Sequence, residues 1–420
     1  MSVPEGWRTL SLTQIAKGGL FSDGDWIETK DQDLRGSVRL TQLADVGVGE
    51  FRDRSARFLR EDQAEALRCT FLEENDILIA RMPDPIGRAC LSPRALGRAV
   101  TAVDVAILRV SNPNIEPRYV MWAINNPAFQ ESVVRLQSGT TRKRISRKNL
   151  ATLAIPIPDI SEQRRIVDIL EDHLSRLDAA EKGLNVSISR LASYELTALS
   201  RCREGEQRPL GELTEIQGGI QKQPKRAPKR NAYPFLRVAN VGKHGLELDD
   251  VHLVELFEGE LDRLRLKLGD LLVVEGNGSA SQIGRAALWD GSIEDCVHQN
   301  HLIRVRAKPG LTPFYLEAVW NSPQNRRDLS DLASSSSGLY TLSVSKLKTL
   351  NVPVPTLQRQ QSLVAEVKNV RDRRGRLETE LSSAAATSGQ LRRSVLAAAF
   401  SGRLTGRSSD IEMVEEMAGV

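Results

Sequence analysis

The chain has 420 residues, which is long enough for two or more domains that each bury a core of their own. Its 58 Lys and Arg residues against 54 Asp and Glu residues leave a net charge of +4, which permits a nucleic-acid partner without requiring one. The cysteines form no CxxC pair, and no stretch approaches the roughly 18 apolar residues of a membrane span, which argues against disulfide scaffolds, zinc ribbons and membrane proteins. The start lacks a signal-peptide pattern, and we expect a cytoplasmic protein.

The chain contains two copies of one long unit. IEPRYVMWAINNP at 115–127 matches LTPFYLEAVWNSP at 311–323, and IPIPDISEQRRIV at 155–167 matches VPVPTLQRQQSLV at 352–364. Because the matches stay in register, they indicate a tandem duplication of a unit of roughly 200 residues, well beyond the period of a solenoid repeat.

The first part of each copy, residues 1–158 and 204–355, is expected to be an α/β or α+β globe. Short apolar runs of strand character alternate there with Gly and Pro, and each copy has one amphipathic helix. The expected strands are 77–80, 103–110, 271–274 and 302–305, and the expected helices are 117–125 and 313–321.

The second part of each copy, residues 159–203 and 356–404, is expected to form one long helix of roughly 65 Å. Asp159 and Thr356 are both residue types that cap helix N-termini. Apolar residues recur at spacings of three and four, which is typical of a coiled-coil seam. The seam residues are Val167, Leu170, Leu174, Leu177, Leu184, Ile188 and Leu191, then Leu363, Val367, Val370, Leu377, Leu381, Leu391 and Val395.

Connectivity constrains how the two helices can meet. If their seams pack together within the chain, the second helix must run antiparallel to the first, with one globe at each end of the rod and an approximate two-fold axis. The alternative is that each seam packs against another chain. The acidic tail, residues 405–420, has no repeat partner and is expected to be flexible.

Basic residues cluster in two segments, GTTRKRISRK at 139–148 and the proline-interrupted QKQPKRAPKR at 221–230. Such segments can bind DNA phosphates, although a solvated charge run is the alternative. The candidate DNA contacts are Arg142, Lys143, Arg144, Arg147 and Lys148, and then Lys222, Lys225, Arg226, Lys229 and Arg230.

A loop that follows the first apolar strand differs between the copies. NDILIARMPDPIGRACL at 75–91 aligns with GDLLVVEGNGSASQIGRAAL at 269–288, so the strand and IGRA are shared while residues 81–85 and 275–282 differ. A variable loop on a common scaffold is a candidate specificity element. Its candidate DNA contacts are Arg81, Arg88, Asn277, Ser279, Gln282 and Arg285.

Catalytic and cofactor motifs are weak. The glycines at 276 and 278 would need a third at Ser281 to resemble a dinucleotide-binding turn, and no phosphate loop is present. No Asn/Asp-Pro-Pro-aromatic segment for holding a flipped adenine occurs. His298 and His301 would lie on opposite faces of a strand. We therefore expect no catalytic, cofactor or metal site in this chain.

PEGW at 4–7, the two proline–helix junctions and the ending LRRSVLAAAFSGRL resemble type I restriction–modification specificity subunits. The resemblance runs from Pro4 to about Leu404. Its most specific part is Glu162-Gln163-Arg164 at the start of the first long helix. The second copy departs from it, with Arg359 in place of Glu162, but it retains Gln360.

The resemblance implies two target recognition domains that each read one half of a split, asymmetric double-stranded DNA site, joined by an antiparallel coiled coil. It implies docking of two modification subunits that bring S-adenosylmethionine, and through them of restriction (translocase) subunits that use ATP and Mg. Two alternatives remain open. One is the specificity component of a type II system that cuts on both sides of its site, and the other is a coiled-coil scaffold that does not bind DNA.

Overall fold

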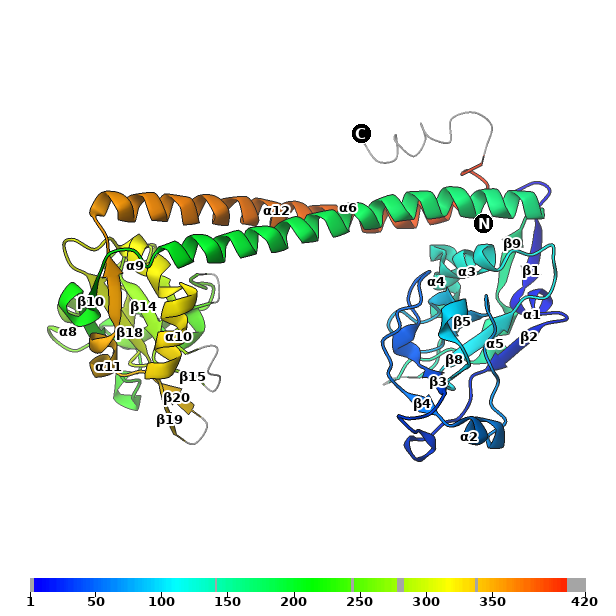
Figure 1. The fold of residues 1–420 in the computed structure, drawn as a ribbon, viewed down its shortest axis with the longest axis horizontal. Helices are drawn as coiled ribbons and strands as arrows, with labels where there is room; N and C mark the ends of the chain where they lie inside the picture. The colour runs from blue at the N-terminus through cyan, green and yellow to red at the C-terminus, as the bar shows by residue number, and fades with distance from the viewer. Residues whose placement is uncertain (1–3, 140–141, 243–244, 278–282, 337–338, 406–420) are drawn as a thin grey trace. The chain divides into compact units, whose positions relative to one another are not determined.

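The computed structural model describes residues 4–139, 142–242, 245–277, 283–336 and 339–405. The chain divides into two compact units, the first formed by residues 1–182 and 382–420 and the second by residues 183–381. Each unit contains one globe and a part of each long helix, α6 (Ile160–Arg201) and α12 (Leu357–Ala399) (Figure 1). The tail from residue 406 onward lies outside the described residues.

The first globe is formed by strands and short helices between residues 8 and 157. The strands are β1 (Arg8–Ser11), β2 (Leu20–Asp23), β3 (Val38–Thr41), β4 (Phe58–Leu59), β5 (Ile77–Ala80), β6 (Ala89–Leu91), β7 (Ala99–Thr101), β8 (Val105–Arg109) and β9 (Ala154–Ile157). The helices are α1 (Leu12–Ile15), α2 (Glu61–Ala66), α3 (Pro117–Asn125), α4 (Pro127–Leu136) and α5 (Arg147–Thr152). The sheets have the orders β2-β8-β5-β6, β4-β3-β7 and β1-β9.

The second globe repeats this topology. Its strands are β10 (Glu206–Pro209), β11 (Thr214–Gly218), β12 (Ala232–Leu236), β13 (His252–Glu255), β14 (Leu271–Val274), β15 (Gly276–Asn277), β16 (Ala286–Leu288), β17 (Val297–His298), β18 (Leu302–Ala307), β19 (Ser334–Ser336), β20 (Leu339–Thr341) and β21 (Asn351–Val354). Its helices are α7 (Leu210–Leu213), α8 (Glu260–Leu264), α9 (Pro313–Trp320), α10 (Pro323–Leu332) and α11 (Val344–Thr349). The sheets have the orders β11-β18-β14-β16, β13-β12-β17 and β10-β21, with a further small sheet β15-β20-β19.

The central strand of each main sheet is apolar throughout because both of its faces are covered. Ile77 and Ile79 of β5 belong to the buried cluster that contains α3, and Leu78 and Ala80 belong to a second cluster. The same alternation occurs along β14, where odd and even residues enter different clusters. The predicted strands and helices are therefore present, and the duplication extends to the packing. β18 runs two residues further than predicted, to Ala307.

In the first unit, the beginning of α6 packs against the end of α12. The residues that share one buried cluster are Val167, Leu170 and Leu174 from α6 and Val395, Leu396, Ala398 and Ala399 from α12. Glu162 is hydrogen-bonded to Thr405, whereas Asp178, further along α6, pairs with Arg392 at 2.5 Å. Because one residue number rises as the other falls, the two segments run antiparallel.

In the second unit, the end of α6 packs against the beginning of α12, and this pairing is also antiparallel. Ala198 and Leu199 share a buried cluster with Leu363 and Val367. Arg201 pairs with Glu366 at 2.5 Å, and beyond the end of α6 Glu204 pairs with Arg359 at 2.7 Å. The predicted antiparallel coiled coil is confirmed, and its seams pack within the chain. The other predicted seam residues, Leu177, Leu184, Ile188, Leu191, Val370, Leu377, Leu381 and Leu391, are half-buried.

The polar residues that interrupt the seam of the second unit pair with one another. The Glu195 carboxylate, on a residue only 8% exposed, accepts hydrogen bonds from Arg371 at 2.7 Å and from Arg374. Arg371 also pairs with Glu317 of α9 at 2.9 Å. Burial lowers the pKa of Arg371, but the hydrogen bond to Glu317 and the other contacts outweigh it and give a net increase. A shift of register would leave these charges unpaired, so they help to specify one alignment. Within the described residues, no helix is long and apolar enough to cross a membrane.

We expect Leu174→Asp to lower the free energy of unfolding by about 3 kcal/mol or more, because it buries a carboxylate among apolar side chains. Urea unfolding followed by circular dichroism measures the change. Ser175→Asp is the matched control, since Ser175 is the exposed neighbour on the same helix and should stay close to the original midpoint. Equal shifts for the two variants would contradict burial of the seam.

Candidate nucleic-acid interface

In the first globe, backbone contacts bring three separate segments together beside the end of β5. The Arg81 N–H donates to the Asp104 carbonyl at 2.9 Å, and the Arg81 carbonyl accepts from the Ile145 N–H at 3.0 Å. Asp25 forms an isolated parallel bridge with Ala102. We call these contacts the backbone frame. It places the variable loop, residues 81–85, next to the basic segment, residues 142–148.

Two hollows flank the variable loop. The first hollow, of about 430 Å³, lies between residues 25–28 and the basic segment, and its lining includes Trp26, Met82, Asp104, Arg142 and Arg144. The second hollow, of about 550 Å³, is lined by residues 83–85 of the loop and by Ile86, together with residues of α4 and Lys143. The sequence predicts the variable loop and the basic segment as two separate candidate sites. In the structure they line the same two hollows.

The basic segment presents its charge at the rim of these hollows. Its five basic side chains are all exposed. Arg144 lies 3.7 Å from Asp104, and Arg147 pairs with Asp23 at 3.3 Å while it donates to the Phe21 carbonyl at 3.0 Å. These contacts hold part of the segment in place and leave the positive charge accessible to a polyanion.

Arg81 and Arg88 do not fit the predicted role of DNA contacts, because they are only 4% and 5% exposed. The Arg81 guanidinium pairs with Asp23 at 2.7 Å and donates to the Val103 carbonyl at 2.7 Å. The Arg88 guanidinium donates to four backbone carbonyls, those of Leu43, Val46, Met82 and Pro85. The hydrogen bonds from Arg88 to Met82 and Pro85 hold the variable loop in place, and the contacts of Arg81 hold the residue at which the loop begins.

The second globe contains the same backbone frame. The Glu275 N–H donates to the His301 carbonyl at 3.0 Å, and the Glu275 carbonyl accepts from the Leu342 N–H at 2.7 Å. Ile220 forms the isolated parallel bridge, here with Gln299. Each contact matches one in the first globe, so the two globes place corresponding loops in corresponding positions.

The basic residues lie on different loops in the two globes. The residues that correspond to the basic 142–144 are Leu, Tyr and Thr at 339–341. Conversely, the basic residues 222–230 correspond to residues 27–35, which contain more acidic than basic side chains. Glu275 and His301 stand where the first globe has Arg81 and Asp104, and they form their own pair at 3.3 Å. Each globe is therefore basic on a different element of the same frame.

Within the basic loop of the second globe, Arg226 is engaged by the protein itself. Its guanidinium makes two hydrogen bonds of 2.7 Å to Glu260 and lies 4.5 Å from the centre of the Phe257 ring. The hydrogen bonds from Arg226 lower the pKa of Glu260 to about 2. The prediction of Arg226 as a phosphate contact is thus replaced by an anchoring role.

The other basic residues of this loop are exposed. Lys222, Lys225, Lys229 and Arg230 remain candidate contacts, and the Glu255 carboxylate fixes the loop by accepting the backbone N–H groups of Lys229 at 2.7 Å and Asn231 at 3.0 Å. Sequence reasoning missed Glu255 and Glu260, because they lie about 30 residues away along the chain.

The remaining predicted contacts are only partly placed. Ser279 and Gln282 lie outside the described residues, and Asn277 is placed only by its backbone in β15. Arg285 is half-buried and donates to the Val238 carbonyl at 3.4 Å. The ring of His298 is buried, with Nδ1 2.9 Å from the Leu302 carbonyl, and burial lowers its pKa to about 4.

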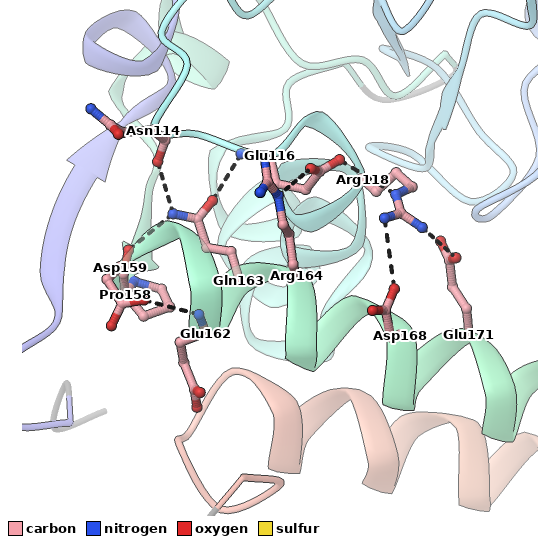
Figure 2. Close-up of polar contacts among 10 residues, drawn as sticks. All are labelled: Asn114, Glu116, Arg118, Pro158, Asp159, Glu162, Gln163, Arg164, Asp168 and Glu171. Atoms are coloured by element: carbon pink, nitrogen blue, oxygen red, sulfur yellow. Dashed lines mark hydrogen bonds and ion pairs between the residues drawn. The ribbon is translucent and has the colours of Figure 1, made fainter.

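A buried glutamine joins each globe to its long helix. The Gln163 side chain accepts from the Glu116 N–H at 2.9 Å and donates to the carbonyls of Asn114 at 3.1 Å and Pro158 at 2.9 Å (Figure 2). Gln360 makes the corresponding three contacts with the Thr312 N–H and the carbonyls of Gly310 and Pro355, at 2.9, 2.9 and 3.0 Å. Both side chains are fully buried.

The residue before each glutamine differs because its surroundings differ. Glu162 is hydrogen-bonded to Thr405, and the Glu162 N–H donates to the capping carboxylate of Asp159 at 3.0 Å. Arg359 instead pairs with Glu204 through two hydrogen bonds of 2.7 and 2.8 Å. The departure of the second copy from the motif is therefore compensated by a different partner.

Comparison with known proteins agrees with the duplicated globes and the helix junctions. Residues 4–190 match the family model of the type I restriction modification DNA specificity domain. The chain is 25% identical over 301 residues to the type I restriction enzyme EcoKI specificity subunit of Escherichia coli K12 and 24% identical over 312 residues to the StySPI specificity subunit of Salmonella potsdam. These alignments cover 66% and 70% of this chain, but only 64% and 66% of the relatives' lengths, which is just under two thirds.

Solved structures show the same fold. A chain from a study of complex assembly and conformational transition of the type I R-M system has a TM-score of 0.72 at 17% identity, with 96% of this chain and 100% of that chain covered. The HsdS subunit from Thermoanaerobacter tengcongensis has a TM-score of 0.57 at 16% identity, with 96% and 99% covered. Residues 4–190 are therefore similar to the DNA specificity domain of type I restriction–modification systems, and the chain as a whole has the fold of these solved structures.

We expect Gln360→Ala to lower the free energy of unfolding by about 1–3 kcal/mol, because it leaves one backbone N–H and two carbonyls of a part-buried junction without the side chain that bonds them. Gln361→Ala is the matched control, since Gln361 is the exposed neighbour and alanine favours a helix. Thermal unfolding of the two variants measures the difference. A Gln360→Ala variant as stable as the control would contradict the role of the junction.

Proposed function

We propose that this chain is the DNA-specificity subunit of a type I restriction–modification complex, in which each globe reads one half of a split, asymmetric double-stranded DNA site. The observation that carries the proposal is that the two globes have matching backbone frames but carry their basic residues on different loops of that frame. Two globes that share a scaffold but differ in surface can recognise two different half-sites, whereas the identical globes of a homodimer cannot.

The exposed basic residues supply the phosphate contacts in this proposal. In the first globe they come from residues 142–148, and in the second from the loop at 222–230 without Arg226. Lys and Arg bound to phosphates release counterions and fix the register of the protein on the duplex, while the neighbouring loops contact base edges.

We also propose that the long helices dock two modification subunits, which bind S-adenosylmethionine, and that restriction subunits using ATP and Mg join through them. The exposure of large side chains on α6 supports a protein-binding surface there: Val186 is 42%, Tyr194 65% and Leu196 54% exposed. In this arrangement the present chain binds and orients the DNA, and the methyl transfer belongs to its partners.

We expect the complex of this chain with its modification subunits to methylate a two-part motif with an unspecified gap. Each part would correspond to one globe, because each globe carries its own frame and loops. Sequencing of methylated positions in DNA from cells that express the complex measures the motif. A continuous motif, or no methylation, would contradict the proposed function.

We expect Lys229→Ala with Arg230→Ala to weaken binding of the complex to its site and to reduce the salt dependence of binding by about one unit of slope per lost phosphate contact. Binding at several salt concentrations measures the slope. Lys308→Ala with Arg327→Ala removes the same charge from exposed positions of the same globe and should leave the slope unchanged. An altered methylation motif in the first variant would mean that this loop reads bases.

A further inference from the structure

Trp26 differs from the other tryptophans in its exposure. It is 72% exposed, whereas Trp122, Trp289 and Trp320 are 8%, 1% and 0% exposed and Trp7 is half-buried. A single exposed apolar side chain needs no special explanation. The position of Trp26 matters because it is fixed and because it lies in the first hollow.

The backbone before Trp26 is held on both sides. The Asp25 N–H donates to the Thr101 carbonyl at 2.8 Å, and the Asp25 carboxylate accepts from the Thr70 N–H at 2.9 Å. Gly24 allows this approach, since a Cβ there would lie 2.3 Å from the Ala102 carbonyl oxygen. The start of this exposed segment is therefore rigidly attached to the sheet.

The indole ring also has a polar neighbour. The Glu28 carboxylate is 2.6 Å from the Lys30 ammonium and lies within reach of a hydrogen bond from the side chain of Trp26. The pKa of Glu28 is lowered first by Lys30 and then by this hydrogen bond. A contact that limits the orientations of an aromatic ring reduces the conformational freedom that the ring loses when it contacts a ligand.

The charges around the first hollow favour a polyanion as the ligand. The acidic lining residues are engaged: Glu28 by Lys30, Asp104 by Arg144 at 3.7 Å, and Asp25 by the Thr70 N–H. The lining itself holds three acidic side chains and two basic ones, Arg142 and Arg144, and the three further basic side chains of the basic segment bring the positive charge into excess. Phosphates at this rim would bring the bases of a duplex toward the ring, where a large apolar side chain can contact a thymine methyl group or wedge against a base step.

We propose that Trp26 is a specificity-determining residue of the first globe, which contacts the bases of one half-site while Arg142 and Arg144 hold the adjacent phosphates. This inference rests on the proposed function of the globes as DNA readers. The corresponding position of the second globe holds Gln221. The two globes thus present an aromatic ring and an amide from the same place in the frame.

The test uses the complex of the full chain with its modification subunits. Trp26→Ala should bind the cognate duplex about tenfold or more weakly and lose discrimination in one half of the motif only, with the other half unchanged. Trp26→Phe should retain most of the discrimination. Leu34→Ala is the matched control, because Leu34 is 82% exposed in the same segment but does not line the hollow.

Tryptophan fluorescence gives an independent readout. Cognate DNA should quench the emission of the original complex, and Trp26→Phe should lose most of that quenching, because the other tryptophans of this chain are buried or half-buried. The comparison of Trp26→Phe with the original complex cancels the signal of the partner subunits. This measurement stays informative even if Trp26→Ala fails to fold.

The outcomes separate the inference from the proposed function. An unchanged motif and affinity in Trp26→Ala, with a two-part motif in the original complex, would overturn the inference and leave the proposed function standing. Loss of subunit assembly in gel filtration by a folded Trp26→Ala would assign the ring to a protein interface and would also overturn it. No motif in the original complex would remove the proposed function and the inference together.

Discussion

The attachment of each globe to its long helix depends on one buried amide. Gln163 and Gln360 each receive one backbone N–H and reach two carbonyls, one of them on the proline that precedes the helix cap. A side chain that both donates and accepts is needed, because the loop before the globular helix and the proline turn offer groups of both kinds. With these bonds made, the direction in which the helix leaves its globe is fixed, and the seam residues that follow face the antiparallel partner segment in the same unit.

The two globes share one backbone architecture but differ in the side chains that they expose. Their main sheets keep the same strand order, and the backbone frame beside β5 recurs beside β14 contact by contact. The basic residues lie on different loops of that frame in the two globes, and Glu275 and His301 occupy the positions of Arg81 and Asp104. Main-chain hydrogen bonds make this exchange tolerable, since they do not depend on the identity of the side chain.

Much of the fold could be predicted because apolar residues recur in the sequence at the spacings of strands and helices. The apolar runs of β5 and β14, the helix at α3 and the coiled-coil seams all follow from the spacing of apolar residues. The site was less predictable. A run of basic residues does not reveal that Arg226 is held by Glu260, or that Arg81 is buried against Asp23, because those partners are distant in sequence. The pairing of Glu195 with Arg371 and Arg374 and the fixed exposure of Trp26 likewise required the tertiary structure.

The choice of glutamine at the junction has a consequence for solution conditions. A glutamate in its place could accept the N–H but, when ionised, could not donate to the two carbonyls, and its hold on the helix would then vary with proton concentration. The amide has no ionisable proton in the physiological range. The three hydrogen bonds of the Gln163 amide are therefore insensitive to acidification.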